Sequence, residues 1–183
     1  MSATEQTTDA ANDREKLHEL LESFDTVMLI TQALPEHGEN AATKDDFELT
    51  SRPMEVARLD DNCDLWFVTD AESAKVYEIT SKPVVHVVAQ DKRDRFVSVR
   101  GTARVLQDKA TIRELWSESH KLWFPDGPES PNIRAIHVAS QEGQYWDNAG
   151  TNKVKYILQA AKAYVSGERM KTGTGDQMGR VEL

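Results

Sequence analysis

In residues 48–75 the chain reads ELTSRPMEVARLDDNCDLWFVTDAESAK, and this stretch decides the fold. A strand-type run over residues 47–59 leads through the polar turn 60–64 into a second strand-type run, 65–69. Asp and Asn residues between two β-rich runs predict a hairpin. A short helix is predicted directly afterwards, over residues 73–80. Two hairpin-linked strands favour an antiparallel sheet over a regular alternation of strands and helices.

The start of this predicted helix carries groups that bind anions. Ser73 offers a hydroxyl and Lys75 an ammonium, and the first N–H groups of a helix lack internal partners at the positive end of the macrodipole. Arg52, one strand away, adds a planar donor that suits phosphate. The structural alternatives are an ordinary N-cap for the serine and solvated surface cations for the other two. The grouping predicts a cradle for a phosphorylated cofactor.

The composition predicts one acidic domain and disfavours several classes of protein. The 183 residues suit a single domain, and 31 acidic against 22 basic residues give a net charge of −9. This charge disfavours nonspecific binding to nucleic acid or to an anionic membrane. The longest apolar runs, 27–30 and 84–89, fall far below the ~20 residues of a membrane span. A single cysteine, Cys63, and an N-terminus without a secretory signal predict a cytoplasmic protein.

Periodicity in the rest of the chain predicts more strands than helices. Apolar residues recur at i, i+3, i+4 and i+7 over residues 17–24, which predicts an amphipathic helix with Asp9 or Asp13 as its N-cap. The other expected elements are strands over 26–34, 84–90 and 95–106, a helix capped by Asp108 that runs to residue 122 or 123, a last hairpin over 133–138 and 144–147 with its turn at Glu142 and Gly143, and a terminal helix over 154–165.

Six or seven strands joined mostly by hairpins predict a mainly β protein, an antiparallel barrel with flanking helices. A closed barrel leaves no exposed strand edges. We expect one barrel domain over residues 14–168, between a flexible N-terminus, 1–13, and a flexible C-terminal tail, 169–183.

Seven short motifs follow one another along the predicted domain. They are RPM at 52–54, LWFVT at 65–69, SAKV at 73–76, RFVSVRGTA at 95–103, LWFPDG at 122–127, YWD at 145–147 and GER at 167–169. Each motif alone is weak, but their order and spacing are specific. With them the chain resembles the pyridoxamine-phosphate-oxidase-like FMN-binding split barrels and, within them, the general stress protein branch.

The resemblance implies a cofactor, a partner and a set of site residues. It implies FMN bound at a homodimer interface, with each flavin touched by both subunits. The implied contacts are Arg52, Pro53 and Met54 along the ring and ribityl chain, Val68 and Thr69 by backbone and hydroxyl, Ser73 and Lys75 at the 5′-phosphate, and Trp123, Phe124 and Trp146 from the other subunit. The residue-based alternative for these three aromatic side chains is core packing.

Departures from the pyridoxine-phosphate oxidases within that family bear on the activity. This chain has Ala74 where those enzymes carry a second basic residue, and Phe96 where they carry a glutamine. After the last tryptophan those enzymes carry Arg-Leu-His, whereas this chain has Asn-Ala-Gly-Thr-Asn-Lys at residues 148–153. The resemblance therefore implies flavin binding and disfavours pyridoxine-phosphate oxidation.

Three functional hypotheses remain open on the sequence. The first is a flavin-dependent oxidoreductase acting on an unknown small substrate, and the alternative is a non-catalytic flavin carrier, store or stress sensor. A deazaflavin or haem user on the same barrel is a third option. The five histidines show no ligand spacing for zinc. The acidic turn around Cys63 raises a thiol pKa and disfavours a nucleophilic role.

Overall fold

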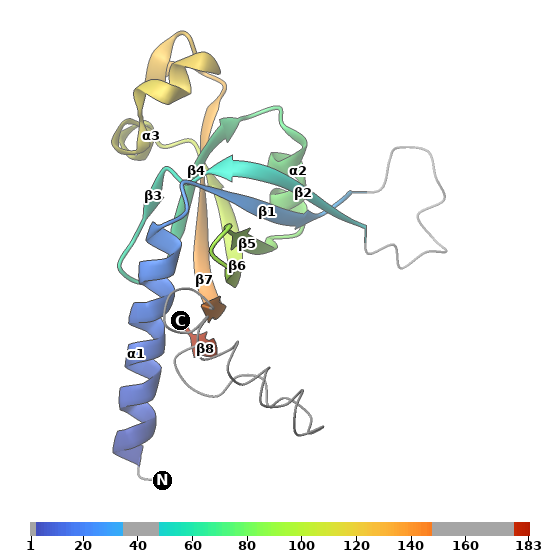
Figure 1. Cartoon of the computed structure of the whole chain (residues 1–183). Coiled ribbons are helices and arrows are strands. Elements are labelled where there is room, and N and C mark those ends of the chain that lie inside the picture. The colour runs from blue at the N-terminus through green and yellow to red at the C-terminus, as the bar shows by residue number, and fades with distance from the viewer. Residues whose placement is uncertain (1–2, 35–47, 148–177) are drawn as a thin grey trace, which may run out of the picture.

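The fold is a curled antiparallel sheet with helices packed around it (Figure 1). The computed structural model describes residues 3–34, 48–147 and 178–183. The described strands are β1 (Thr26–Gln32), β2 (Leu49–Glu55), β3 (Arg58–Leu59), β4 (Leu65–Asp70), β5 (Val84–Gln90), β6 (Arg95–Leu106), β7 (Ile133–Asp147) and β8 (Met178–Glu182). The described helices are α1 (Ala3–Glu22), α2 (Ala74–Ser81), α3 (Lys109–Leu115) and the 3₁₀ helices η1 (Glu118–Leu122) and η2 (Gly127–Glu129). The mainly β, antiparallel architecture predicted from the sequence is confirmed.

The sheet closes into a barrel through one bent stretch of chain. The strands pair in the order β2-β1-β5-β6-β7-β4-β3, so β2 and β3 end the path although only two residues separate them. The N–H of Val56 donates to the Asp25 carbonyl (2.9 Å) on the β1 side. The next N–H, of Ala57, donates to the Trp66 carbonyl (2.8 Å) on the β4 side. The strand predicted over 47–59 therefore consists of two halves, β2 and β3, and each half pairs with a different neighbour.

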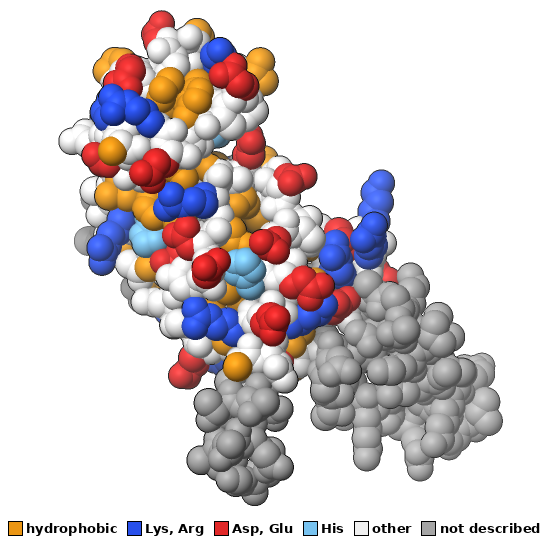
Figure 2. All heavy atoms as spheres, turned by 90° about the vertical axis from the view of Figure 1, so that its left-hand side faces the viewer, with side chains coloured by type: hydrophobic (Ala, Val, Ile, Leu, Met, Phe, Trp, Pro, Cys, Tyr) orange, Lys and Arg blue, Asp and Glu red, His pale blue; other side chains and the backbone are white. Residues whose placement is uncertain are grey.

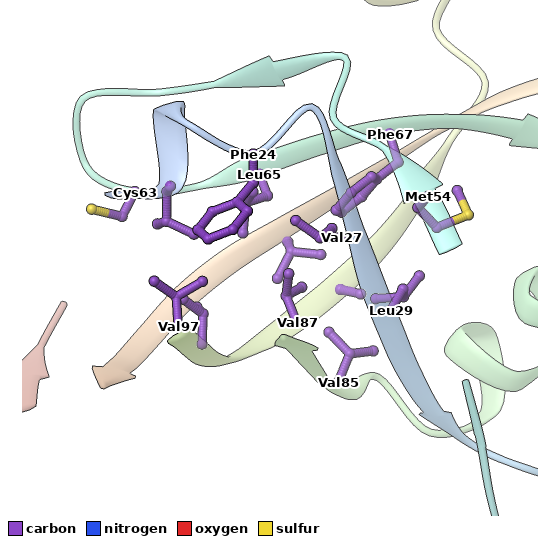
Figure 3. Close-up of a cluster of buried hydrophobic side chains, with 14 of the residues drawn as sticks. Phe24, Val27, Leu29, Met54, Cys63, Leu65, Phe67, Val85, Val87 and Val97 are labelled. Carbon is purple, nitrogen blue, oxygen red and sulfur yellow. The ribbon is translucent and has the colours of Figure 1, made fainter. Parts of the chain in front are cut away.

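The core fills the barrel from alternate positions of its strands. Val27 and Leu29 of β1 point inward and are almost fully buried, as the period of two requires. Figure 3 shows these side chains gathered between the strands with Phe24, Phe67 and other apolar residues. Each fully buried side chain of this kind contributes about 1.5–3 kcal/mol. The apolar interior therefore holds the strands at the positions from which the site is built.

Helix α1 supplies one apolar face to this core. Its four predicted core residues, Leu17, Leu20, Leu21 and Phe24, are all buried, although Phe24 follows the helix end. The helix begins at Ala3, before the predicted caps Asp9 and Asp13 and within the segment 1–13 that we expected to be flexible. Asp13 instead accepts a hydrogen bond from the Tyr145 hydroxyl (2.6 Å). A tertiary contact thus replaces the capping role that the sequence suggested.

The predicted last hairpin is wrong, because β7 is one continuous strand of 15 residues. The predicted turn at Glu142 and Gly143 lies inside it, near a register shift opposite Arg100 and Gly101. A Cβ on Gly143 would lie 2.1 Å from a Leu17 methyl carbon. The glycine therefore allows close approach of α1 to the sheet, which a sequence cannot distinguish from a turn.

The C-terminal tail, predicted to be flexible over 169–183, ends in β8, which extends the sheet beside β7. Val181 is buried on this strand, and a Cβ on Gly179 would lie 2.4 Å from the Tyr145 ring. Residues 178–182 of this tail are thus a strand of the sheet. Strand pairing with a distant segment orders this short polar stretch, and local composition does not reveal it.

Residues 109–131, which we call the lobe, lie at one end of β7 (Figure 1). Asp108 caps α3 as predicted, since its carboxylate accepts the Thr111 N–H (2.8 Å). The helix ends at Leu115, however, and the predicted run to residue 122 or 123 is broken before η1. Ser117 and His120 form a capping box that starts this new turn. The predicted helix over 154–165 lies outside the described residues.

Candidate functional site

The predicted anion cradle lies where β4 runs into α2. The β4 strand ends at Asp70, whose side chain accepts the Glu72 N–H (2.7 Å) and forms the turn. Ser73 occupies the N-cap position, but its hydroxyl donates backward to the Asp70 carbonyl (2.8 Å). No side chain therefore caps the first turn of α2. The N–H groups of Ser73 and Val76 donate to backbone carbonyls, whereas those of Ala74 and Lys75 have no partner among the described residues and remain available to an anion.

Thr69, Ser73 and Lys75 come together at this point. The Lys75 ammonium donates to the Thr69 hydroxyl (3.0 Å), which shares a hydrogen bond with the Ser73 hydroxyl (3.2 Å). Burial lowers the pKa of Lys75, and the nearby Arg52 guanidinium lowers it further, against the opposing effect of Glu78 and Asp70. A half-buried ammonium bonded to a neutral hydroxyl beside a second cation is a favourable place for an anion.

Arg52 points into the end of the barrel that α2 covers. It lies two positions before buried Met54 on β2 and therefore on the same face of the strand, so its side chain faces inward. Its guanidinium donates to the hydroxyls of Thr31 and Thr50 and to the Glu78 carboxylate of α2 (2.8 Å to Oε2). Arg52 is thus neither an ordinary surface cation nor free of protein partners. Sequence reasoning singled out neither Thr31 nor Glu78, because neither carries a recognisable motif.

Four predicted site residues therefore form one cluster, Arg52, Thr69, Ser73 and Lys75, which we call the cradle. It offers an ammonium, two hydroxyls and a guanidinium at an uncapped helix start. This donor set suits the terminal phosphate of a mononucleotide, because a dianion can use charged donors, hydroxyls and helix N–H groups together. The residues present thus fit a phosphorylated flavin.

The other predicted site residues lie in the core or on separate surfaces. Met54 belongs to the main core, whereas Pro53 is exposed on the outer face of β2. Val68 and Phe124 pack in a second apolar cluster beneath α3, with Ile112. For Phe124, only 6% exposed, the structure shows the core packing that the sequence left as an alternative.

The two predicted tryptophans lie at opposite ends of β7. Trp123 follows η1 in the lobe and is 79% exposed, next to Leu122, which is 84% exposed. Trp146 lies 13 residues along β7 from Ile133, the end of the strand next to the lobe. At about 3.3 Å per residue, about 40 Å of strand separates Trp146 from that end. Trp146 pairs in register with Phe96 and Met178, which are exposed. One subunit therefore presents them on different surfaces.

Figure 2 shows one face of the molecule, with apolar side chains exposed among interleaved acidic and basic ones. A cavity of about 520 Å³ lies between α1, the turn after β3, and β8, at the end of β7 away from the cradle. Its lining residues are Ala11, Arg14, Glu15, His18, Asp61, Val181 and Glu182.

Among the described helices, none has both the length and the apolar character that crossing a membrane requires.

Comparison with solved structures supports the barrel. The putative general stress protein 26 from Jannaschia sp. CCS1 superposes with a TM-score of 0.62 at 19% identity, over 95% of this chain and 99% of that one. The general stress FMN/FAD binding protein from Xanthomonas citri gives a TM-score of 0.58 at 22% identity, over 76% of this chain and 92% of that one. At these identities the likeness is one of fold.

Sequence comparison identifies the family. Protein bli-3 of Neurospora crassa is 27% identical over 130 residues, which are 66% of this chain. The chain thus spans 62% of the length of this curated relative. The family model described as pyridoxamine 5'-phosphate oxidase like matches residues 12–171, most of the chain. Because this match includes the barrel and the cradle together, the chain belongs to the pyridoxamine 5'-phosphate oxidase like family.

Proposed function

We propose that this protein binds FMN in the cradle and works as a flavin-dependent oxidoreductase on a small substrate. The observation that carries the proposal is the Lys75 ammonium, which is half-buried, bonded to the Thr69 hydroxyl and close to a second cation, Arg52. It lies at the uncapped start of α2. The Xanthomonas citri protein, described as binding FMN or FAD, has the same fold.

The cradle favours FMN over FAD. In this proposal Lys75, Ser73 and the first turn of α2 hold the 5′-phosphate, and Arg52 adds charge from within the barrel. A terminal phosphate dianion presents more free oxygens to such donors than a bridging pyrophosphate does. The bound flavin supplies hydride or electron transfer, while the protein binds and orients it. Pyridoxine-phosphate oxidation remains disfavoured, because Ala74 stands where those oxidases carry a second basic residue.

We also propose a cytoplasmic homodimer with the flavin at the subunit interface. Leu122 and Trp123 form an exposed apolar pair, and water-exposed patches of this kind mark interaction surfaces. Because Trp123 and Trp146 lie at opposite ends of β7, one subunit can bring only one of them to a given flavin ring. We assign that contact to Trp123 because its indole is the more exposed of the two.

Titration of the flavin-free protein tests the phosphate assignment. Lys75→Ala should weaken FMN binding by about 1.5–3 kcal/mol, the range for a charge-assisted hydrogen bond. This corresponds to roughly tenfold to over a hundredfold in Kd, measured by flavin fluorescence. Lys82→Ala, at the other end of α2, is the matched control and should bind like the wild type. Equal affinities for wild type and Lys75→Ala would remove the phosphate from this position.

Reduction of the bound flavin separates the enzyme from the carrier. Under anaerobic conditions, NADH or NADPH should bleach the flavin absorption band of an oxidoreductase within seconds to minutes. A holoprotein that stays oxidised with both nucleotides, yet is bleached by dithionite, would instead support the non-catalytic carrier or sensor. The visible spectrum of the purified protein also distinguishes flavin from deazaflavin and haem.

A further inference from the structure

Glu78 is a carboxylate buried beside the two cations of the cradle, and the proposed function gives it no contact with the ligand. Its side chain is 7% exposed. A carboxylate this close to a phosphate site repels the ligand and weakens binding unless it does something else. Its position on α2, three residues after Lys75, therefore calls for a physical reason.

The contacts of Glu78 supply that reason. Its Oε2 accepts from the Thr31 hydroxyl (2.6 Å) and from Arg52 Nη2 (2.8 Å), and its Oε1 accepts from the Thr50 hydroxyl (3.1 Å). Both threonine hydroxyls in turn accept from Arg52. The Thr31 and Thr50 side chains thus bridge the guanidinium and the carboxylate, since each hydroxyl accepts from Arg52 and donates to Glu78. Such a network leaves a long arginine side chain one orientation.

The network does not use the whole guanidinium. Arginine has five N–H donors, and the three bonds to Thr31, Thr50 and Glu78 all come from the two Nη atoms. Two further donors, one of them on Nε, have no hydrogen-bond partner in the described part of the chain and can meet a ligand. The carboxylate compensates the buried Arg52 charge before any ligand binds, whereas Lys75 has only the Thr69 hydroxyl as a hydrogen-bond partner among the described residues.

We infer that Glu78 is a positioning residue for the phosphate site. It holds the Arg52 guanidinium across the covered end of the barrel, where the two remaining N–H donors meet the phosphate, and it does not touch the ligand itself. The inference rests on the proposed function, since it needs a phosphorylated ligand in the cradle. It predicts that loss of the Glu78 charge weakens phosphate recognition, although a negative charge near an anion disappears.

The test compares FMN with riboflavin, which lacks the phosphate, on flavin-free wild type, Glu78→Gln and Glu72→Gln. Flavin fluorescence gives Kd for each pair. Glu78→Gln should bind FMN about tenfold more weakly than the wild type and riboflavin with unchanged affinity. Glu72→Gln removes the same charge from an exposed position just before α2 and should leave both affinities unchanged. A merely structural role would lower both affinities together and would not change their ratio.

Three outcomes overturn the inference. Tighter FMN binding by Glu78→Gln would mean that the carboxylate only repels the ligand, and an unchanged or parallel response to both flavins would mean no role in positioning. If Glu78→Gln does not fold, Thr50→Val carries the test, because it removes one bridge between Glu78 and Arg52 and should cause a smaller loss specific to FMN. A wild type that binds FMN no tighter than riboflavin would instead overturn the proposed function itself.

Discussion

The covered end of the barrel and the lobe differ in how costly side chains are placed: the first buries charged groups, and the second exposes apolar ones. At the covered end, the charges of Arg52 and Glu78 are buried, and each finds its partners within the same chain. In the lobe, Leu122 and Trp123 are apolar and exposed, and the described residues do not cover them. The first region is complete in one subunit, whereas the second is completed only by something outside it. We therefore expect phosphate recognition to depend on one subunit and ring contacts to depend on two.

The same contrast holds for the ion pairs of the two regions. The Arg52–Glu78 pair has side chains 20% and 7% exposed, whereas both members of the Arg113–Glu129 pair in the lobe are 57% exposed. A buried pair is costly to break because it leaves an uncompensated charge, while an exposed pair contributes little. Stability measurements should therefore separate the two regions clearly.

The largest expected effect is the loss of Arg52. Arg52→Met leaves the Glu78 carboxylate buried without its cation and should lower the free energy of unfolding by about 3 kcal/mol. Chemical denaturation of the flavin-free protein measures this. The double variant Arg52→Met/Glu78→Met should recover most of the loss, because no buried charge remains. Arg113→Met is the control from the lobe and should cost less than about 1 kcal/mol. Equal losses for Arg52→Met and Arg113→Met would contradict the contrast.

A smaller effect is expected from the lobe, and it concerns assembly. Trp123→Ser should weaken the homodimer by about 2 kcal/mol, or roughly thirtyfold in its dissociation constant, if this indole is an anchor of the interface. Sedimentation equilibrium or light scattering over a concentration series provides the measurement. Tyr77→Ser, which replaces a 56% exposed aromatic side chain on α2, should leave dimerisation unchanged. A wild type that is monomeric at micromolar concentration would end the dimer proposal.

The smallest expected effect is a pH dependence at the start of η1. Burial lowers the pKa of His120 from its ordinary 6.5, against a raising effect of Glu55, and its Nδ1 accepts the Ser117 N–H (3.0 Å). As pH falls below 6.5, the unfolded chain takes up this proton before the folded one does. Stability therefore falls as the pH falls through this window.

His120→Asn tests this, because the asparagine oxygen can accept the Ser117 N–H at every pH. Denaturation midpoints of this variant should lose the wild-type dependence on pH just below 6.5. His86→Asn, which replaces an exposed histidine of β5, should keep it. Identical pH profiles for wild type and His120→Asn would show that another group titrates in this window.

Much of the sheet and part of the site follow from local sequence. The strands over 84–90 and 95–106, the Asp108 cap and the helix start at Ser73 agree with the sequence prediction, because propensities and turn residues there act over a few positions. The motif residues Arg52, Thr69, Ser73 and Lys75 were also predicted as neighbours. The run of β4 directly into α2 accounts for Thr69, Ser73 and Lys75, whereas Arg52 comes from β2.

Tertiary structure alone decided the rest, because the deciding contacts join residues far apart in sequence. Gly143 lies inside a strand and not in a turn because Leu17 of α1 requires the space, and residues 178–182 form a strand because β7 offers them an open edge. The Arg52–Glu78 pair likewise joins positions 26 residues apart. It forms because the inward face of β2 and one face of α2 come together only in the folded barrel. The sequence by itself determined which chemical groups the chain has for binding a phosphate. The fold determined that an acidic side chain would be placed among them to hold the arginine.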